Sequence, residues 1–290
     1  MYAATFDYYR ARSLADARQL LAAHPGAKLL AGGHSLVPLL KLRLAAPSAV
    51  VDIGRVPELR GITRSGDVIR VGALTTHAEL AASTDLRGAA EALSEAAAVV
   101  GDPAVRNRGT IGGNVAHADP ASDLPTVLVA LGARMIAAGE QGERTIDAEQ
   151  FFTGIMTTAL ADAEILVAID VPVAGPGQGS AYEKFAHPAS RYAVVGAAAQ
   201  VTIQDGACTA ARVAVGGPLP HARRASAVER ALIGKPASPE TIAAGARLVA
   251  DDLGGDATGD LFASAEYRAA MTPVYVRRAL ETAVARATKR

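Results

Sequence analysis

The sequence is poor in aromatic residues and in cysteine. It contains no tryptophan and a single cysteine, Cys208, and aromatic residues make up 4% of its 290 residues. One cysteine forms no internal disulfide and cannot by itself ligate an iron–sulfur cluster. We therefore interpret Cys208 as a small buried apolar residue.

The chain also lacks an excess of charge of either sign. Lys and Arg together number 29, as do Asp and Glu, so the formal net charge is zero. Proteins that bind nucleic acids or anionic membrane surfaces need a basic excess, and we predict neither activity. No basic segment followed by an apolar one opens the sequence, and no apolar run approaches the roughly 20 residues of a membrane span. With 50% apolar residues, the composition predicts a cytoplasmic protein with a substantial core.

Hydrophobic periodicity predicts a strand–helix–strand unit near the start of the chain. Ser13, followed by leucines at helical spacing, predicts a capped helix over residues 13–24. The stretch "AKLLAGG" at 27–33 predicts a strand that ends in a glycine turn. A helix over 36–44 and a second strand over 49–56 are expected to follow.

The rest of the chain shows the same mixture of strands and helices. Hairpins are predicted over 58–74 and 133–146, with helices between them, whereas residues 101–123 are expected to be a glycine-rich polar segment. The Gly/Pro stretch at 174–180 marks a domain boundary. Beyond it, strands are predicted first and a helical tail from about residue 223. Strands followed by helices in both halves indicate α+β architecture.

The stretch "AGGHSL" at residues 31–36 joins the predicted strand to the predicted helix. Gly32 and Gly33 permit a tight bend and close approach of the backbone to a ligand. Ser35 is typical of a helix N-cap. Unpaired N–H groups at such a turn bind anions, so the stretch is either a phosphate cradle or a plain strand–helix turn. It matches neither G-x-G-x-x-G nor the Walker A pattern, the two commonest nucleotide-binding loops.

A second stretch, "GTIGGN" at residues 109–114, has similar chemistry. Thr110 offers a hydroxyl group, Gly112 and Gly113 permit close backbone approach, and Asn114 both donates and accepts hydrogen bonds. This second turn thus repeats the chemistry of the first.

Three ionisable residues follow this turn in "AHADPASDLP": His117, Asp119 and Asp123. Their spacing matches no standard metal-ligand pattern, and we predict no metal site. Asp123 precedes an apolar helical run, which makes it an N-cap, a carboxylate that binds a ligand hydroxyl, or both. The sequence indicates no role for His117.

Two long stretches that contain the glycine turns resemble one known family. They are "LLAGGHSLVPLLKLRLAAPSAVVDIGRV" (residues 29–56) and "DPAVRNRGTIGGNVAHADPASDLP" (residues 102–125). Both resemble the FAD-binding medium subunits of molybdenum hydroxylases, the xanthine dehydrogenase family. In pattern they are most similar to the medium subunits of aerobic carbon monoxide dehydrogenases. The similarity extends from "FDYYR" near the start to "EYRAAMTPVYVRRALE" near the end.

The resemblance implies an α+β fold with two domains. A PCMH-type FAD-binding domain is expected over residues 1–177, with subdomains over about 1–55 and 56–177. A smaller α+β C-terminal domain, an antiparallel sheet plus helices, is expected over residues 178–290.

The resemblance also implies non-covalent FAD, whose pyrophosphate the two glycine turns hold. Asp123 is expected to bind a cofactor hydroxyl, and Leu166 to contact an apolar part of the cofactor. Lys184 is expected to lie near the flavin, the alternative being an exposed lysine on a strand. Tyr192 is expected beside the isoalloxazine ring, where it tunes the flavin. No residue is assigned as catalytic, because the flavin itself carries out the redox chemistry. The full cofactor-binding set is Ala31, Gly32, Gly33, His34, Ser35, Thr110, Ile111, Gly112, Gly113, Asn114, Asp123, Leu166, Lys184 and Tyr192.

By the same resemblance, the chain is the electron-transfer subunit of a heterotrimeric molybdenum-containing dehydrogenase. A large subunit with a molybdopterin cofactor oxidises the substrate, and a small subunit carries two-iron, two-sulfur clusters. The FAD passes electrons to an external acceptor: a quinone, NAD, oxygen or a carrier protein. An acceptor partner is also what would associate the complex with a membrane. A dimer of heterotrimers is expected. The substrate is left open among carbon monoxide, an aldehyde and an N-heterocycle.

Two alternatives remain at this stage. One is a stand-alone flavoprotein oxidoreductase of the same fold, which would need its own substrate cavity. The other is a non-redox scaffold subunit whose turns bind a different nucleotide. A flavin spectrum in the purified chain distinguishes the scaffold from the other two.

Overall fold

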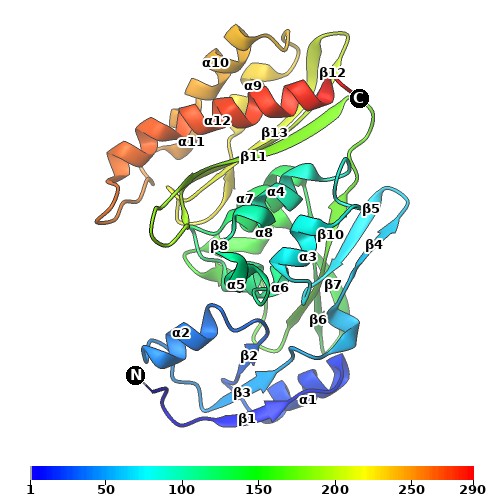
Figure 1. Ribbon diagram of the computed structural model, residues 1–290, viewed down its shortest axis with the longest axis vertical. Coiled ribbons are helices and arrows are strands. Elements are labelled where there is room, and N and C mark those ends of the chain that lie inside the picture. Colours follow the sequence, from blue (N-terminus) through cyan, green and yellow to red (C-terminus); the bar gives the residue numbers. More distant parts are fainter. Residues whose placement is uncertain (1) are drawn as a thin grey trace.

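The computed structural model describes residues 2–290. Its elements form three groups along the long axis of the molecule (Figure 1). A three-stranded sheet lies at one end, a five-stranded sheet with its helices in the middle, and a four-stranded sheet with further helices at the other end. The α+β class and the two-part arrangement expected from the sequence are confirmed.

The N-terminal group is a parallel sheet in the order β1-β3-β2. Its elements are β1 (Asp7–Arg10), α1 (Leu14–Ala23), β2 (Lys28–Leu30), α2 (Leu36–Lys41) and β3 (Ala49–Asp52), followed by the 3₁₀ turn η1 (Pro57–Leu59). Ser13 caps α1 as predicted, by accepting a hydrogen bond from the Asp16 N–H at 3.1 Å. Because β2 pairs in parallel with β3, the predicted strand–helix–strand unit is confirmed. Strand β1 was not predicted, because its four residues are mostly exposed and show no apolar alternation.

The middle group contains an antiparallel sheet in the order β4-β5-β10-β6-β7. Its strands are β4 (Ile62–Ser65), β5 (Val68–Gly72), β6 (Arg134–Gly139), β7 (Gly142–Asp147) and β10 (Ile165–Pro172). The short strands β8 (Phe152–Gly154) and β9 (Thr157–Thr158) form a separate pair. Both predicted hairpins are present. The central strand β10 is buried over nearly its whole length, as its continuous apolar sequence requires.

Six helices accompany this sheet within the described part of the chain. They are α3 (His77–Ala82), α4 (Glu91–Val99), α5 (Pro103–Arg106), α6 (Ile111–His117), α7 (Asp123–Leu131) and α8 (Ala148–Phe151). Every residue of α7 is buried, because this helix lies between the middle group and the C-terminal sheet. The α7 sequence is accordingly apolar on all sides.

The segment 101–123 is more ordered than the sequence indicated. It contains α5, α6 and the start of α7 rather than a continuous polar loop. Asp102 and Thr110 each accept a hydrogen bond from a backbone N–H in the first turn of the following helix. These caps start two short helices that glycine-rich composition argues against.

The C-terminal group is an antiparallel sheet in the order β11-β12-β13-β14, covered by four helices. The strands are β11 (Gln178–Ala186), β12 (Ala193–Gln204), β13 (Ala207–Gly216) and β14 (Arg223–Arg224). The helices are α9 (Ser226–Leu232), α10 (Pro239–Arg247), α11 (Val249–Leu253) and α12 (Ala265–Ala287). Helix α12 crosses β11 and β12 (Figure 1), and Cys208 is buried in the core between sheet and helices.

Among residues 2–290, no helix combines the length and the apolar character that crossing a membrane requires.

Candidate functional site

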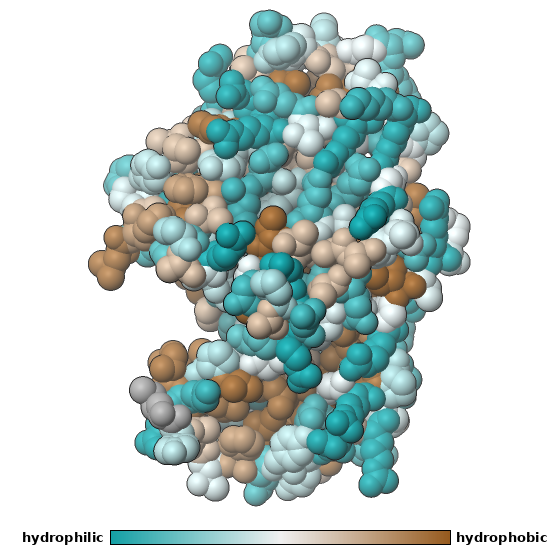
Figure 2. Space-filling model, viewed as in Figure 1, coloured by the Kyte–Doolittle hydropathy of each residue, from teal (hydrophilic) through white to brown (hydrophobic). Residues whose placement is uncertain are grey.

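A cavity of about 580 Å³ lies between the N-terminal sheet and the middle group. Figure 2 shows the molecule deeply hollowed at one edge, between the N-terminal lobe and the rest. Three regions line the cavity: the turn between β2 and α2, the segment from α3 to the start of α7, and β10 together with the β11–β12 connection. The two glycine turns predicted to act together therefore meet at one site.

The first glycine turn presents its backbone to the cavity. The backbone N–H groups of residues 32–36 donate no hydrogen bond to any described residue. Gly33 has φ of +77°, in the left-handed region that favours glycine. A Cβ on Gly32 would lie 2.0 Å from the Arg108 carbonyl oxygen, so only glycine lets this turn pack against the second loop. A row of free N–H groups in such a bend is a concave anion site.

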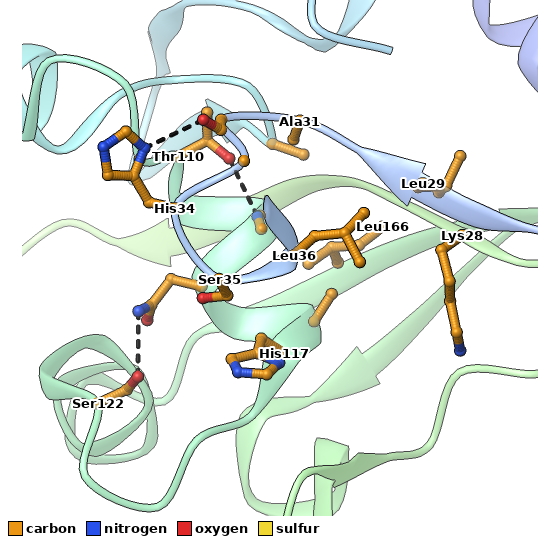
Figure 3. A pocket seen from close by; sticks show the side chains of 18 of the residues that line it. Lys28, Leu29, Ala31, His34, Ser35, Leu36, Thr110, His117, Ser122 and Leu166 are labelled. Carbon is orange, nitrogen blue, oxygen red and sulfur yellow. Dashed lines mark hydrogen bonds between the residues drawn. The ribbon is translucent and has the colours of Figure 1, made fainter. Parts of the chain in front are cut away.

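Ser35 differs from its predicted role. It occupies the N-cap position of α2, but its backbone is already helical and its hydroxyl makes no capping hydrogen bond. The hydroxyl instead lies beside the cavity (Figure 3) and is free to contact a ligand.

The second glycine turn forms the first turn of α6, and most of its amides are already used. The N–H of Ile111 donates to the Thr75 carbonyl, that of Gly112 to the Ala73 carbonyl at 2.8 Å, and that of Gly113 to the Thr110 hydroxyl. The first two bonds fix α6 to the segment that follows β5. Of the two turns, only the first therefore has a row of unbonded amides.

The second turn contributes a side chain to the cavity instead. Asn114 donates from Nδ2 to the Ser122 hydroxyl at 3.1 Å (Figure 3), while its Oδ1 is buried without a partner. A buried acceptor left unpaired is costly in free energy. Because Asn114 lines the cavity, a donor on a bound ligand would satisfy it.

A buried ion pair lies at the end of the cavity next to the C-terminal domain. Asp123, the first residue of α7, accepts hydrogen bonds from Tyr182 Oη at 2.6 Å and from Lys184 Nζ at 2.8 Å. Lys184 also donates to the Val99 carbonyl at 3.1 Å, and its side chain is only 6% exposed. Burial raises the pKa of the Asp123 carboxyl, and the Lys184 ammonium opposes that rise. Burial and the neighbouring carboxylate raise the pKa of Tyr182, so its phenol stays protonated and donates.

Leu166 and Tyr192 lie at different ends of the cavity. Leu166 belongs to β10, where the register shifts between Leu166 and Ala168, and Figure 3 shows it near Leu36 and Leu29. Tyr192 is 42% exposed and lies in the β11–β12 connection. The N–H of the next residue, Ala193, donates to the Ala121 carbonyl at 3.0 Å, which holds Tyr192 near the Asp123 end.

All but two of the predicted cofactor-binding residues line this cavity. Ile111 does not, because its side chain is fully buried in the core. Lys184 lies behind Asp123 rather than in the wall, and it is not the exposed strand lysine that the sequence left open. His117 lines the cavity as well, and nothing in its contacts indicates a role.

The structure also places residues in the wall that the sequence did not indicate. The clearest are Lys28, His77, Asp162 and Arg191. Arg191 directly precedes Tyr192 of the predicted set, and Lys28 lies in the strand that leads to the first glycine turn, which is the only signal in the sequence. His77 carries no such signal. Among residues 2–290, no group of three or more His, Cys, Asp or Glu side chains is arranged to hold a metal ion.

Comparison with protein families gives two matches that together cover most of the chain. Residues 4–174 match the family described as "FAD binding domain in molybdopterin dehydrogenase". Residues 180–283 match the family described as "CO dehydrogenase flavoprotein C-terminal domain".

Individual proteins are similar over nearly their full length. The chain is 41% identical to the alpha subunit of the 6-hydroxypseudooxynicotine dehydrogenase complex of Paenarthrobacter nicotinovorans, over 98% of this chain and 96% of that protein. It is 38% identical to the carbon monoxide dehydrogenase medium chain of Hydrogenophaga pseudoflava, over 97% and 98%. A solved carbon monoxide dehydrogenase structure from that organism superposes with a TM-score of 0.94 at 40% identity, covering 99% of both chains. Quinoline 2-oxidoreductase from Pseudomonas putida 86 gives a TM-score of 0.92 at 34% identity, again covering 99% of both chains.

Proposed function

The chain belongs to the family of FAD-binding subunits of molybdopterin dehydrogenases, and we propose that it carries electrons on FAD within a complex of several subunits. The observation that carries this proposal is the cavity in which the first glycine turn presents the free N–H groups of residues 32–36. These groups suit a diphosphate that is bound without a metal ion.

The residues along the cavity fit the parts of FAD in order. We assign the apolar end with Leu29 and Leu166 to the adenosine half, and the first glycine turn to the diphosphate. We assign the end with Asp123 and Tyr192 to the flavin half, and the unpaired Asn114 Oδ1 to a cofactor hydroxyl. When bound, FAD accepts electrons one at a time and releases one or two. The protein's own part is to bind, orient and partly cover the cofactor.

Asp123 and Lys184 act together in this assignment. Lys184 and Tyr182 hold the two carboxylate oxygens of Asp123, each of which can accept a further hydrogen bond, and Asp123 lines the cavity. Asp123 is thereby fixed as an acceptor for a cofactor hydroxyl. Lys184 contributes as its support rather than through direct contact with FAD.

We further propose that residues 1–177 form the FAD-binding domain, with subdomains over about 1–55 and 56–177, and residues 178–290 the C-terminal domain. The link between β10, which ends at Pro172, and β11, which begins at Gln178, supports this boundary. The buried cluster between the C-terminal sheet and its helices supports it as well, because all of its members lie within residues 178–290.

The partners follow from the family. Relatives are named as one subunit or the medium chain of multi-subunit dehydrogenases. We propose a large molybdopterin subunit that oxidises the substrate and a small iron–sulfur subunit that delivers electrons, assembled as a dimer of heterotrimers in the cytoplasm. The external acceptor is a quinone, NAD, oxygen or a carrier protein.

The first test is flavin binding by the isolated chain. We expect a purified sample to show flavin absorbance or to take up added FAD, and acid denaturation to release all of it because the attachment is non-covalent. A folded, colourless chain that takes up no FAD would contradict the proposal and leave the scaffold alternative. Bleaching of the bound flavin by substrate without any partner chain would favour the stand-alone oxidoreductase.

The glycine turn provides a sharper test. Gly33→Val introduces a side chain where φ is +77° and where a Cβ already lies 3.1 Å from Val37, so the turn must deform and FAD retention should be lost. Gly206→Val is the matched control, because Gly206 has φ of +76° in open space far from the cavity lining. Both variants should lose about 1–3 kcal/mol of stability from backbone strain. Full FAD occupancy in folded Gly33→Val would overturn the diphosphate assignment.

A further inference from the structure

His77 is a buried histidine in the cavity wall that the assignments above do not use. It is the first residue of α3, whose start is fixed by a reciprocal pair of hydrogen bonds between Thr76 and Glu79. The His77 N–H donates to the Gly109 carbonyl at 3.0 Å, which ties α3 to the second loop. The residue is only 3% exposed, so its ring is held in place by packing.

Neither ring nitrogen of His77 forms a hydrogen bond with any described residue. Nδ1 is buried without a partner, and Nε2 lies against Gly109. A Cβ on Gly109 would lie 2.8 Å from the His77 Cδ2 atom and 2.9 Å from Nε2. The missing side chain at position 109 therefore leaves this edge of the ring uncovered, in a wall that both residues line. A partner for Nε2 can come from the cavity, whereas the buried Nδ1 is left as the nitrogen without one.

The surroundings of the ring keep it neutral. Burial, with smaller contributions from His34 and from the positive charge of Arg106, lowers the pKa of His77 to about 4. Arg106 is itself held by the Val100 and Gly101 carbonyls. A neutral imidazole has one donor and one acceptor nitrogen.

We propose that the neutral imidazole of His77 donates a hydrogen bond from Nε2 to an oxygen of the FAD diphosphate. The proposal rests on the assignment of the first glycine turn to the diphosphate. Gly109 lies between His77 and the first glycine turn. A Cβ built on Gly32 would lie 3.0 Å from the Gly109 Cα atom. His77 thus approaches the diphosphate from the second loop, the side whose backbone amides are already engaged.

The test compares FAD binding by apoprotein variants at pH 7.5, measured by quenching of flavin fluorescence. His77→Leu removes the donor and should weaken FAD binding about tenfold or more. His77→Gln places an amide donor near the Nε2 position and should stay within about threefold of the wild type. Gly109→Ala covers the Nε2 edge and should resemble His77→Leu. His24→Leu is the control, because His24 stacks on Tyr9 outside the cavity lining and its loss should not change FAD affinity.

A second ligand tests the position of the contact. ADP carries the diphosphate without the flavin, and its affinity, measured by competition with FAD, should fall by the same factor in His77→Leu. A loss for FAD with none for ADP would overturn the assignment to the diphosphate.

Other outcomes separate this proposal from the proposed function. If the wild type binds FAD and His77→Leu, folded by its thermal unfolding curve, binds it equally well, His77 is not a cofactor ligand. An equal loss in His77→Gln and His77→Leu would show a packing role only. If His77→Leu does not fold, the Gln and Gly109→Ala variants still decide the question. Failure of the wild type to bind FAD would instead remove the proposed function itself.

Discussion

At the scale of single residues, the Asp123–Lys184 ion pair is held almost entirely out of solvent. The two side chains are 5% and 6% exposed, and the Nζ–Oδ2 distance is 2.8 Å. Lys184→Met would leave the carboxylate buried beside a single remaining donor, Tyr182. We expect the free energy of unfolding of the apoprotein to fall by about 3–5 kcal/mol, measured by urea denaturation.

The double variant Lys184→Met with Asp123→Asn controls for this effect. It removes the charge along with its partner, and the side-chain amide introduced at position 123 can still accept from Tyr182, so part of the lost stability should return. A loss below about 1 kcal/mol in Lys184→Met alone would mean that Asp123 is not held as an ion pair.

His77 makes a prediction about acid stability that does not depend on a ligand. Its folded-state pKa of about 4 lies below the ordinary value of 6.5, so between these pH values the unfolded state binds more protons than the folded state. This contribution to stability is therefore complete above pH 6.5 and declines as the pH falls toward 4, by about 3 kcal/mol in total. Other groups also titrate in this range. The measurement is therefore the difference in the free energy of unfolding between the wild type and His77→Gln. As the pH falls from 6.5 to 4, the free energy of unfolding of the wild type should decrease relative to that of His77→Gln. A difference that stays constant over this range would contradict the buried neutral state.

At the scale of secondary structure, the sequence predicts well those elements whose signals are local. The Ser13 cap, the apolar spacing of α1 and the tight turns of both hairpins lie within a few residues of the elements they specify. The first glycine turn belongs to this class, since its free amides follow from Gly32 and Gly33 and the adjoining strand and helix. Such features need no knowledge of the rest of the fold.

The elements that the sequence missed depend on distant contacts. Helix α6 contains two glycines, and it forms because its amides meet the carbonyls of Ala73 and Thr75 on another segment. Tyr182 supports Asp123 across 59 residues of sequence, and no local pattern connects them. His77 enters the cavity wall because its backbone pairs with Gly109. Most of the residues that the family resemblance indicated line the cavity, but the resemblance did not show which of them touch the cavity and which support it.

At the scale of the whole molecule, α7 and β11 connect the cavity to the C-terminal domain. Helix α7 begins at Asp123 in the cavity wall and runs beneath β12 and β13, while β11 supplies both Tyr182 and Lys184 to Asp123. The C-terminal domain therefore completes the Asp123 end of the cavity rather than only adding a surface to it. Removing that domain would expose the Asp123 carboxylate and the apolar faces of α7.

A cluster of charged side chains joins α12 of the C-terminal domain to α4 of the middle group. Arg286 of α12 donates to the Ser180 carbonyl at 2.7 Å and pairs with Glu95 of α4, with Glu91 close by. These side chains are about one-third exposed, so solvent screens the pairs, and Arg286→Met should lower the free energy of unfolding by only about 1 kcal/mol in urea. Arg277→Met is the matched control on the same helix, because its pair with Glu281 is 3.8 Å long and exposed, and its loss should cost less than about 0.5 kcal/mol. FAD affinity should not change in either variant, since neither residue lines the cavity. Equal stability of the two variants would show that the domains are held together by their apolar contact alone, through α7 and the C-terminal sheet.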